Sequence, residues 1–217
     1  PMLVEFDGAY YESLSLAMMR TLLGFPKVEP GFPPDRFVHR GYSGLEWLKV
    51  GPLVVPVDDT VSALVPYRGN KFSFPYLSLA DVIAERVPLA KLKGKIALVG
   101  TTASGLQDLR STPVASVYPG VEVHANVISG MLDGRIKQKP AYMLGAEVLL
   151  LVLTGAALAF LIPMLSALWA SVASAGALAA NVGLSTVVWS EIHTVLPLAT
   201  GVLMIVTLYT MNMAYGY

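Results

Sequence analysis

Four polar side chains in the middle of the sequence could bind a small ligand. Asp108, Arg110 and Thr112 alternate along one short stretch, and His124 follows in the next expected helix. A carboxylate, a guanidinium, a hydroxyl and an imidazole together offer hydrogen-bond donors and acceptors. Open α/β sheets bind ligands beyond the carboxyl ends of their strands, and these residues follow an apolar stretch at residues 95–100. They are therefore candidate ligand-binding residues.

The same residues also have a purely structural interpretation. Asp108 would cap a turn and Arg110 would pair with it, because Asp, Ser and Thr in turns mostly bond the local backbone. His124 lies three residues after Val121 and four before Ile128, on the apolar side of its expected helix. A lone histidine in that position is more often half-buried than a ligand or a base. Both interpretations stay open at this point.

The sequence contains no pattern typical of a metal site. Cysteine is absent, which excludes disulfide bonds, thiolate zinc sites and thiol nucleophiles. The remaining histidines, His39 and His193, are not at metal-ligand spacing from His124. Asp58 and Asp59 would need more oxygen ligands than their neighbourhood supplies. We expect no metal in this chain.

The sequence also lacks the patterns of a catalytic nucleophile and of a nucleotide-binding loop. Ser104 does not stand in a G-x-S-x-G turn. Residues 100–105, "GTTASG", have the glycines of a phosphate loop but lack the Lys-Ser/Thr ending. We therefore expect no catalytic residue and no cofactor in this chain.

The last third of the chain is almost free of charge. All fifteen lysines and arginines lie at or before Lys139, and beyond it only Glu147 and Glu191 are charged. The apolar sequence is interrupted twice, which leaves three segments of about 20 residues, enough to cross roughly 30 Å of hydrocarbon. We predict three transmembrane helices, over about 144–161, 165–189 and 196–215, and therefore a lipid bilayer as partner.

The second predicted span carries small residues at four-residue spacing. Ser171, Ala175, Ala179 and Gly183 would let another helix approach closely, either within the bundle or across a dimer. The alternative is an alanine-rich span with no specific partner. Asn181, in the same span, would bond a neighbouring helix as amides in membranes usually do. No acid, base or histidine lies at mid-membrane to mark an ion path.

Residues 1–140 are polar and long enough to bury one core. Fifteen basic and thirteen acidic side chains leave this part nearly neutral, which argues against nucleic acid as a partner. The patterns alternate between strand and helix, so we predict an α/β domain with a mixed sheet, followed by an all-α bundle over residues 141–217. The expected elements are a helix over 9–23, a loop over 26–44, a hairpin over 52–69 around Asp58-Asp59, a helix from Ser78 to Val87, a buried strand over 95–100 and a helix over 119–134.

Two motifs resemble a known family. The stretches "GKIALVGTTASGLQDLRSTP" and "YPGVEVHANVISGMLDG" are similar to the type-two CHASE domain, an extracellular sensory family of bacteria. The resemblance covers residues 8–140 and includes "SLSLAMMRTLLG", "PVDDTVSALVPYRG" and "FPYLSLADVI". The matching positions are Gly94, Lys95, Gly100, Asp108, Thr112, Pro113, Pro119, Gly120, Val121, Glu122, His124, Ala125 and Asn126.

This resemblance implies a receptor. Residues 1–140 would be an extracytoplasmic sensor, and three helices in the bacterial inner membrane would connect it to a cytoplasmic output domain absent from this chain. The implied output is a class III adenylate cyclase, which uses ATP and Mg²⁺, or otherwise a histidine or Ser/Thr kinase. The implied partners are a second copy of the chain and an extracytoplasmic small ligand or protein. We expect the chain to be the middle of a longer protein, with a span before Pro1 and the output domain after Tyr217.

The charge pattern does not decide on which side of the membrane residues 1–140 lie. The basic stretch at residues 135–139 would place the polar domain in the cytoplasm under the positive-inside rule, but long domains translocate largely regardless of charge. A rival interpretation is a membrane-tethered dimerisation module without a ligand. A sensor should hold a closed polar cavity near Asp108 and His124, whereas an assembly module should expose an apolar patch.

Overall fold

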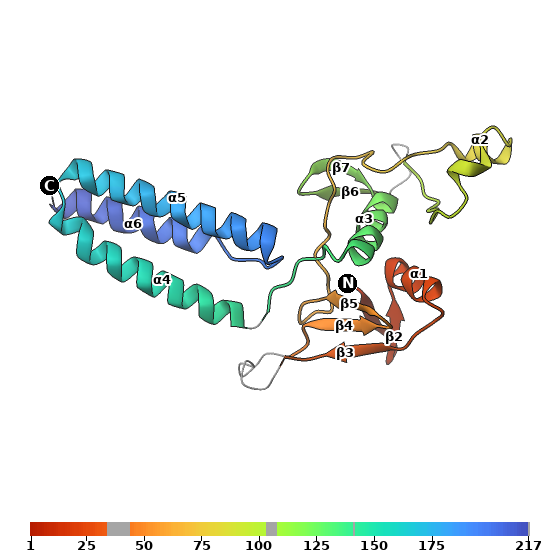
Figure 1. Ribbon diagram of the computed structural model, residues 1–217, viewed down its shortest axis with the longest axis horizontal. Coiled ribbons are helices and arrows are strands. Elements are labelled where there is room, and N and C mark those ends of the chain that lie inside the picture. The colour runs from red at the N-terminus through yellow and green to blue at the C-terminus, as the bar shows by residue number, and fades with distance from the viewer. Residues whose placement is uncertain (34–43, 103–107, 141, 217) are drawn as a thin grey trace. The chain divides into compact units, whose positions relative to one another are not determined.

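The computed structural model describes residues 1–33, 44–102, 108–140 and 142–216. The chain forms two compact units (Figure 1). The first consists of Pro1–Val28, Val50–Val55 and Ser62–Ile136, and the second of Glu29–Lys49, Pro56–Val61 and Lys137–Tyr217. The first unit is α/β, and the second contains the long apolar helices.

The chain begins with a β-hairpin. Strands β1 (Leu3–Phe6) and β2 (Ala9–Glu12) pair antiparallel with Leu3 opposite Glu12. Asp7 and Gly8 form the turn with positive φ angles of 51° and 73°, the conformation that two-residue hairpin loops require. The predicted helix over 9–23 is therefore wrong in its first four residues, because the Asp-Gly turn extends the chain through β2.

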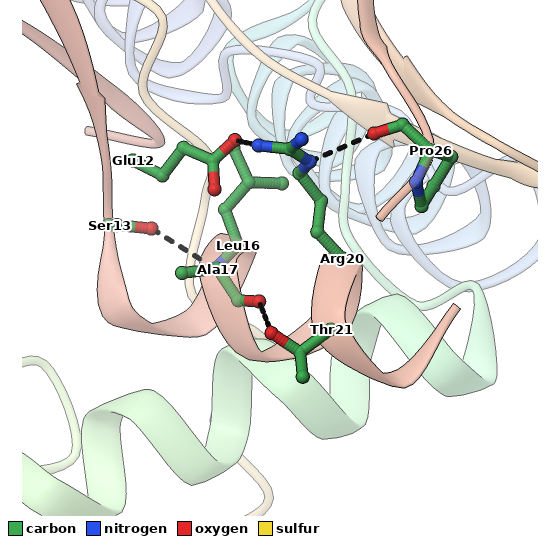
Figure 2. A network of polar contacts seen from close by, with 7 residues as sticks. All are labelled: Glu12, Ser13, Leu16, Ala17, Arg20, Thr21 and Pro26. Carbon is green, nitrogen blue, oxygen red and sulfur yellow. Dashed lines mark hydrogen bonds and ion pairs between the residues drawn. The ribbon is translucent and has the colours of Figure 1, made fainter. Parts of the chain in front are cut away.

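Helix α1 (Leu14–Leu22) forms the remainder of that predicted helix. Ser13 caps its N-terminus, and its Oγ accepts a hydrogen bond of 3.3 Å from the amide of Leu16. Arg20 pairs with Glu12, and its Nε donates to the carbonyl of Pro26 at 2.9 Å (Figure 2). These contacts attach both ends of α1 to the chain before and after it.

The second sheet contains three short strands in the order β3 (Val28–Gly31), β4 (Trp47–Val50) and β5 (Leu53–Pro56). The predicted loop over 26–44 therefore includes a strand. The predicted hairpin over 52–69 is wrong in its pairing, because β5 follows β4 after a two-residue turn in which Gly51 has a φ of 59°. Asp58 does form a turn, but no strand follows it among residues 62–69.

The predicted buried strand over 95–100 is also wrong. These residues form no strand, and Ile96 and Val99 are exposed. A strand forms only where a neighbour accepts its backbone hydrogen bonds, so an apolar β-rich pattern is not sufficient by itself. The helix predicted from Ser78 to Val87 is reduced to α2 (Leu79–Ile83), with Ser78 at the N-cap position but without a side-chain capping bond. The turn η2 (Leu89–Lys91) follows it.

Helix α3 (Gly120–Asp133) confirms the prediction over 119–134. The antiparallel strands β6 (Leu109–Thr112) and β7 (Ala115–Pro119) precede it, and Gly134 ends it with a φ of 64°. Gly134 adopts the left-handed conformation that glycine accommodates without strain at helix ends. The mixed α/β character is confirmed, but the described strands form three small sheets in place of one mixed sheet.

The core of the first unit lies where α1 packs against α3. Each helix buries one apolar stripe, as amphipathic helices do. The buried apolar residues of the two helices are Leu16, Met19, Val127, Ile128 and Met131. The contact between α1 and α3 therefore joins the start of the chain to the helix that follows β7.

The second unit contains the helices α4 (Tyr142–Leu161), α5 (Ala167–Glu191) and α6 (Ala199–Gly216). Short connections join them, including η3 (Ile162–Met164), and α6 packs against both α4 and α5 (Figure 1). Among the described residues, the segments Tyr142–Met164 and Ala167–Glu191 are long and apolar enough to cross a membrane, and most of their residues are exposed. The third predicted span forms the 18-residue α6, which is not one of these two.

Polar side chains of α5 set its antiparallel register with α6. Ser185 Oγ donates to the carbonyl of Leu196 at 3.2 Å, and the hydroxyls of Ser171 and Tyr209 lie 2.9 Å apart. Of the predicted small-residue stripe, Ser171 therefore belongs to the α5–α6 contact. Its other three members are exposed: Ala175, Ala179 and Gly183.

Candidate functional site

The structure brings two of the four candidate ligand residues together. Arg110 Nη2 lies 3.9 Å from Asp108 Oδ1, and both side chains are substantially exposed. Asp108 also lies at the first turn of α3, because its carbonyl accepts from the amide of Gly120 at 2.8 Å. A Cβ added at Gly120 would lie 2.2 Å from Oδ1 of Asp108. The carboxylate therefore sits where the helix dipole favours negative charge.

The other two candidates bond elsewhere. Thr112 Oγ1 donates to the carbonyl of Ala115 at 3.0 Å and closes the β6–β7 turn. His124 Nδ1 lies 2.9 Å from Oγ of the buried Ser15 and so takes part in the contact between α3 and α1. The four side chains therefore occupy three different local environments.

A buried carboxylate on α3 that was not among the candidate ligand residues accepts three hydrogen bonds. Glu122 is 2% exposed, and its carboxylate accepts hydrogen bonds from the amides of Phe72 and Ser73 at 3.0 and 2.8 Å. The phenol of Tyr76 donates a third bond of 2.8 Å. A buried carboxylate is stable only when such donors replace water. Glu122 therefore anchors residues 72–76 to the first turn of α3.

Asn126, one helical turn further along α3, extends this anchor. Its Nδ2 donates to the phenol oxygen of Tyr118 at 2.9 Å and to the carbonyl of Glu122 at 2.8 Å. Its Oδ1 accepts from the amide of Arg68 at 2.9 Å. Arg68 also pairs with Asp133 at the end of the helix. We call residues 67–76 together with Tyr118, Glu122 and Asn126 the α3 clamp.

The tyrosines of the clamp are held in their neutral form. Burial raises the pKa of Tyr67 and of Tyr118, which pack edge to face with ring centroids 5.3 Å apart. Burial and the hydrogen bond to Glu122 raise the pKa of Tyr76 far above its usual value. Ionised phenols would face the Glu122 carboxylate, so the clamp is built for neutral tyrosines.

We expect the first unit to lose stability above about pH 10. Burial raises the pKa of Tyr118 in the folded chain, so the unfolded state loses its tyrosine protons first, binds fewer protons and gains stability relative to the folded state as the pH rises. The fall in stability should not exceed roughly 1.4 kcal/mol per pH unit for this group, and below pH 9 it should vanish. Urea unfolding at pH 9 and pH 11 measures it. Tyr118→Phe should reduce the loss, whereas the exposed Tyr10→Phe should not.

The segment between α3 and α4 is hydrogen-bonded to the connection between α5 and α6. The amide of Gln138 donates to the carbonyl of His193, and the amide of Val195 donates to the carbonyl of Gln138, both at 3.0 Å. These bonds form a parallel bridge between Gln138 and Thr194. We call residues 137–139 and 193–195 the junction. Through it, the segment before α4 is bonded to the connection that leads from α5 to α6.

Lys137 strengthens the junction at the end of α5. Its ammonium donates to the carbonyl of Trp189, and it lies 5.1 Å from the centroid of the Trp189 ring. Because α5 ends at Glu191, that carbonyl belongs to its last turn, where a cation is favourable. The contact also has cation–π geometry.

The first unit has an open apolar groove. Its volume is about 420 Å³, and its lining residues come from α1 and from the exposed stretch after Lys95: Ala17, Met18, Thr21, Leu22, Ile96 and Ala97. The groove offers apolar contacts and only one hydroxyl. It is suited to an apolar side chain or segment rather than to a charged ligand.

The other residues that the sequence analysis considered for metal binding or catalysis either form a local turn or lie outside the described residues. Asp58 Oδ1 accepts from the amide and the hydroxyl of Thr60 at 2.9 and 2.6 Å, as in an Asx turn. The described residues contain no group of three or more His, Asp or Glu that could hold a metal ion. His39, Ser104 and most of the loop over 100–105 lie outside the described residues.

Sequence reasoning could have found part of the clamp. Glu122 and Asn126 are four residues apart on a helix face that otherwise buries apolar groups, which is a signal for a buried polar pair. Their partners over 67–76 are about fifty residues earlier in the chain, and no local pattern indicates that contact. Lys137 and Trp189 are likewise far apart in sequence and meet only in the fold.

The comparison with protein families gives one match. The family model of the CHASE2 domain matches residues 1–162. The match covers α3, the junction segment before α4 and α4 itself. No curated protein and no solved structure matches the chain.

Proposed function

This chain belongs to the CHASE2 domain family, and we propose that it is the sensory and transmembrane region of a bacterial receptor that regulates a cytoplasmic output domain. CHASE2 domains are extracellular sensor domains of membrane proteins, and two helices of this chain could cross a membrane. The proposed location is the inner membrane, with residues 1–140 outside the cytoplasm. The family match combined with these apolar helices is the observation that carries the proposal.

The lengths and aromatic residues of the helices support a membrane bundle. Trp169 and Trp189 lie twenty residues apart on α5, which corresponds to about 30 Å along a helix axis. Exposed tyrosines also lie at helix ends, Tyr142 at the start of α4 and Tyr215 at the end of α6. Trp and Tyr typically occupy the two membrane–water interfaces. We propose that α6 is the third span, because it lies against both α4 and α5.

The junction suggests how a signal would pass. Residues 137–139 continue covalently into α4 and are hydrogen-bonded to the connection between α5 and α6. A displacement at the end of α3 would therefore move the ends of three helices together rather than α4 alone. Such shifts of packed helices are an established way to bias a dimeric output domain. We propose Asp108 and Arg110, the exposed pair among the candidates, as ligand contacts, and a homodimer as the signalling unit.

Labelling of introduced cysteines should reveal three membrane crossings. The chain has no native cysteine, so each variant carries a single reactive thiol. In intact cells, an impermeant maleimide should label Lys93→Cys and His193→Cys. It should label Ser166→Cys and Gly216→Cys only after lysis. Labelling of Gly216→Cys in intact cells would leave two crossings and contradict the third span, and the reverse pattern at all four positions would contradict the orientation.

We propose a class III adenylate cyclase as the output, which would use ATP and Mg²⁺. The test is cAMP accumulation by the full-length receptor in a bacterial strain that lacks its own adenylate cyclase. We expect cAMP well above the vector control, and Gln138→Pro should reduce regulation because it removes one bond of the junction. Phosphate transfer from labelled ATP without cAMP would identify a kinase output and overturn the cyclase assignment.

A second candidate function is a membrane-tethered dimerisation module without a ligand. It is favoured by the open groove along α1 and by exposed apolar side chains nearby, including Leu14, Phe25 and Val99. This interpretation requires that the first unit associates without any added molecule. A concentration-dependent dimer whose output does not respond to extracytoplasmic fractions would favour it over the sensor.

A further inference from the structure

We infer that residues 96–100 pair as an antiparallel strand with the same segment of a second copy of the chain. This inference rests on the homodimer proposed above and names the surface through which the two extracytoplasmic parts meet. The segment reads Ile-Ala-Leu-Val-Gly and lies in the first unit. Its backbone, its exposed side chains and the groove beside it each point to a partner strand.

The backbone over residues 96–100 has no hydrogen-bond partner among the described residues. The amide of the preceding Lys95 still donates to the carbonyl of Leu92 at 3.1 Å, but no backbone bond to another described residue follows over the next five residues. Apolar and β-branched residues without proline are typical of strands. A row of unpaired amides and carbonyls on such a segment is a template for a strand from another chain.

The side chains of this segment are apolar and yet lie in water. Val99 is 79% exposed and Ile96 is 43% exposed. The open groove of about 420 Å³ lies directly beside them, because Ile96 and Ala97 line it together with α1. An exposed apolar side chain and an open apolar groove both gain free energy when they are covered, since apolar area is then removed from water.

A second copy suits this surface because the segment is complementary to its own reverse. A two-fold axis between antiparallel strands places one residue opposite itself, since hydrogen-bonded and non-hydrogen-bonded pairs alternate. With Leu98 in that position, Val99 of one copy lies opposite Ala97 of the other, and Ile96 lies opposite Gly100. Each larger side chain then faces a smaller residue. Val99 thereby reaches the groove that Ala97 of the other copy lines.

The lysines before the segment favour the same arrangement. Lys91, Lys93 and Lys95 are all exposed. In a parallel pair each lysine would lie opposite its own copy, and like charges directly opposite each other are destabilising. In the antiparallel pair about Leu98, Lys95 lies opposite the uncharged Thr101 and the other two lysines lie beyond the paired residues. The charge pattern therefore agrees with the pairing that the side-chain sizes select.

Disulfide cross-linking of the whole chain in cell membranes tests the register. The chain has no native cysteine, so each variant carries one thiol. Leu98→Cys should cross-link to a dimer under mild oxidation, because directly opposite Cα atoms lie about 4.5–5.5 Å apart and a disulfide needs less than about 7 Å. Ala97→Cys and Val99→Cys should cross-link weakly alone but strongly when produced together. Lys93→Cys is the exposed control and should not cross-link.

A second variant measures the contribution of the exposed valine. Val99→Asp should weaken dimerisation of the whole chain in mild detergent about tenfold or more, because each dimer contains this side chain twice. Its melting temperature should stay that of the wild type, since Val99 is exposed within one copy. Ile83→Asp changes a side chain of the same unit that is 74% exposed and should dimerise as the wild type does. Analytical ultracentrifugation gives the dimer fraction of each variant.

Three results would overturn the inference. Equal cross-linking of Leu98→Cys and Lys93→Cys would show that the segments do not pair in register, and an unchanged dimer in Val99→Asp would place the contact elsewhere. A disulfide between Leu98→Cys and another protein, without a cross-linked dimer, would assign the segment to a foreign strand. A chain that stays monomeric at every concentration would instead contradict the proposed homodimer itself, so the two failures are distinguishable.

Discussion

Glu122→Ala should release residues 67–76 from α3 and destabilise the first unit by several kcal/mol. The substitution leaves the amides of Phe72 and Ser73 and the phenol of Tyr76 without their shared acceptor. Phe72, Ser73 and Tyr76 are themselves exposed, so water can partly replace the lost bonds, and three bonds at about 0.5–1.5 kcal/mol net each give an expected total of about 2–4 kcal/mol. That is a large fraction of the about 5–15 kcal/mol that stabilises a typical domain. Hydrogen exchange should show faster deuterium uptake at residues 70–76.

Two further variants show whether the destabilisation comes from the lost hydrogen-bond acceptor or from the lost packing of the side chain. Glu122→Gln keeps the shape and one carbonyl oxygen, so its exchange rates should lie between those of the wild type and Glu122→Ala. Glu85→Ala removes an exposed carboxylate of the same unit and should change nothing measurable. Unchanged uptake at residues 70–76 in Glu122→Ala would show that the clamp does not depend on the carboxylate.

Gly201→Val should separate α6 from α5. A Cβ at Gly201 would lie 2.4 Å from Nδ2 of Asn181. The two helices can therefore approach this closely only because Gly201 has no side chain. Valine adds two further methyl groups at this contact, and overpacking of this kind costs about 1–3 kcal/mol. Asn181 Oδ1 is buried without a hydrogen-bond partner among the described residues. We expect loss of protease resistance and of the Ser171–Tyr209 contact.

Gly176→Val is the matched control within the same bundle. Gly176 is also helical, but a Cβ there meets nothing within 4 Å. Limited proteolysis of both variants in detergent should therefore show rapid cleavage between α5 and α6 only for Gly201→Val. Equal resistance of the two variants would mean that α5 and α6 do not depend on close approach at Gly201.

The predictions that succeeded concern features encoded over a few residues. α3 was predicted with its start at Pro119-Gly120 and its end at Gly134, because helical periodicity and a left-handed glycine are local signals. The apolar character of α4 and α5 was equally readable from composition. The Asp7-Gly8 turn was also a local signal, but the helical pattern over 9–23 obscured it.

The predictions that failed depend on partners elsewhere in the chain. Residues 95–100 have the composition of a buried strand, yet they form none, because pairing needs a neighbouring strand in register. β5 pairs next to β4 rather than with the residues after Asp58, since both pairings suit its composition and only the fold selects one. His124 could have faced a ligand, and the packing of α1 instead placed Ser15 beside it.

The sequence by itself determined an α/β part followed by apolar helices, the extent of α3 and the similarity to CHASE2 domains, because these properties depend on neighbouring residues and on composition. Only the tertiary structure decided that Glu122 anchors residues 72–76, that Ser171 rather than Gly183 meets α6, and that Lys137 reaches Trp189. Contacts between residues fifty positions apart depend on how whole elements pack. The contacts of the α3 clamp and of the junction therefore become visible only in the folded chain.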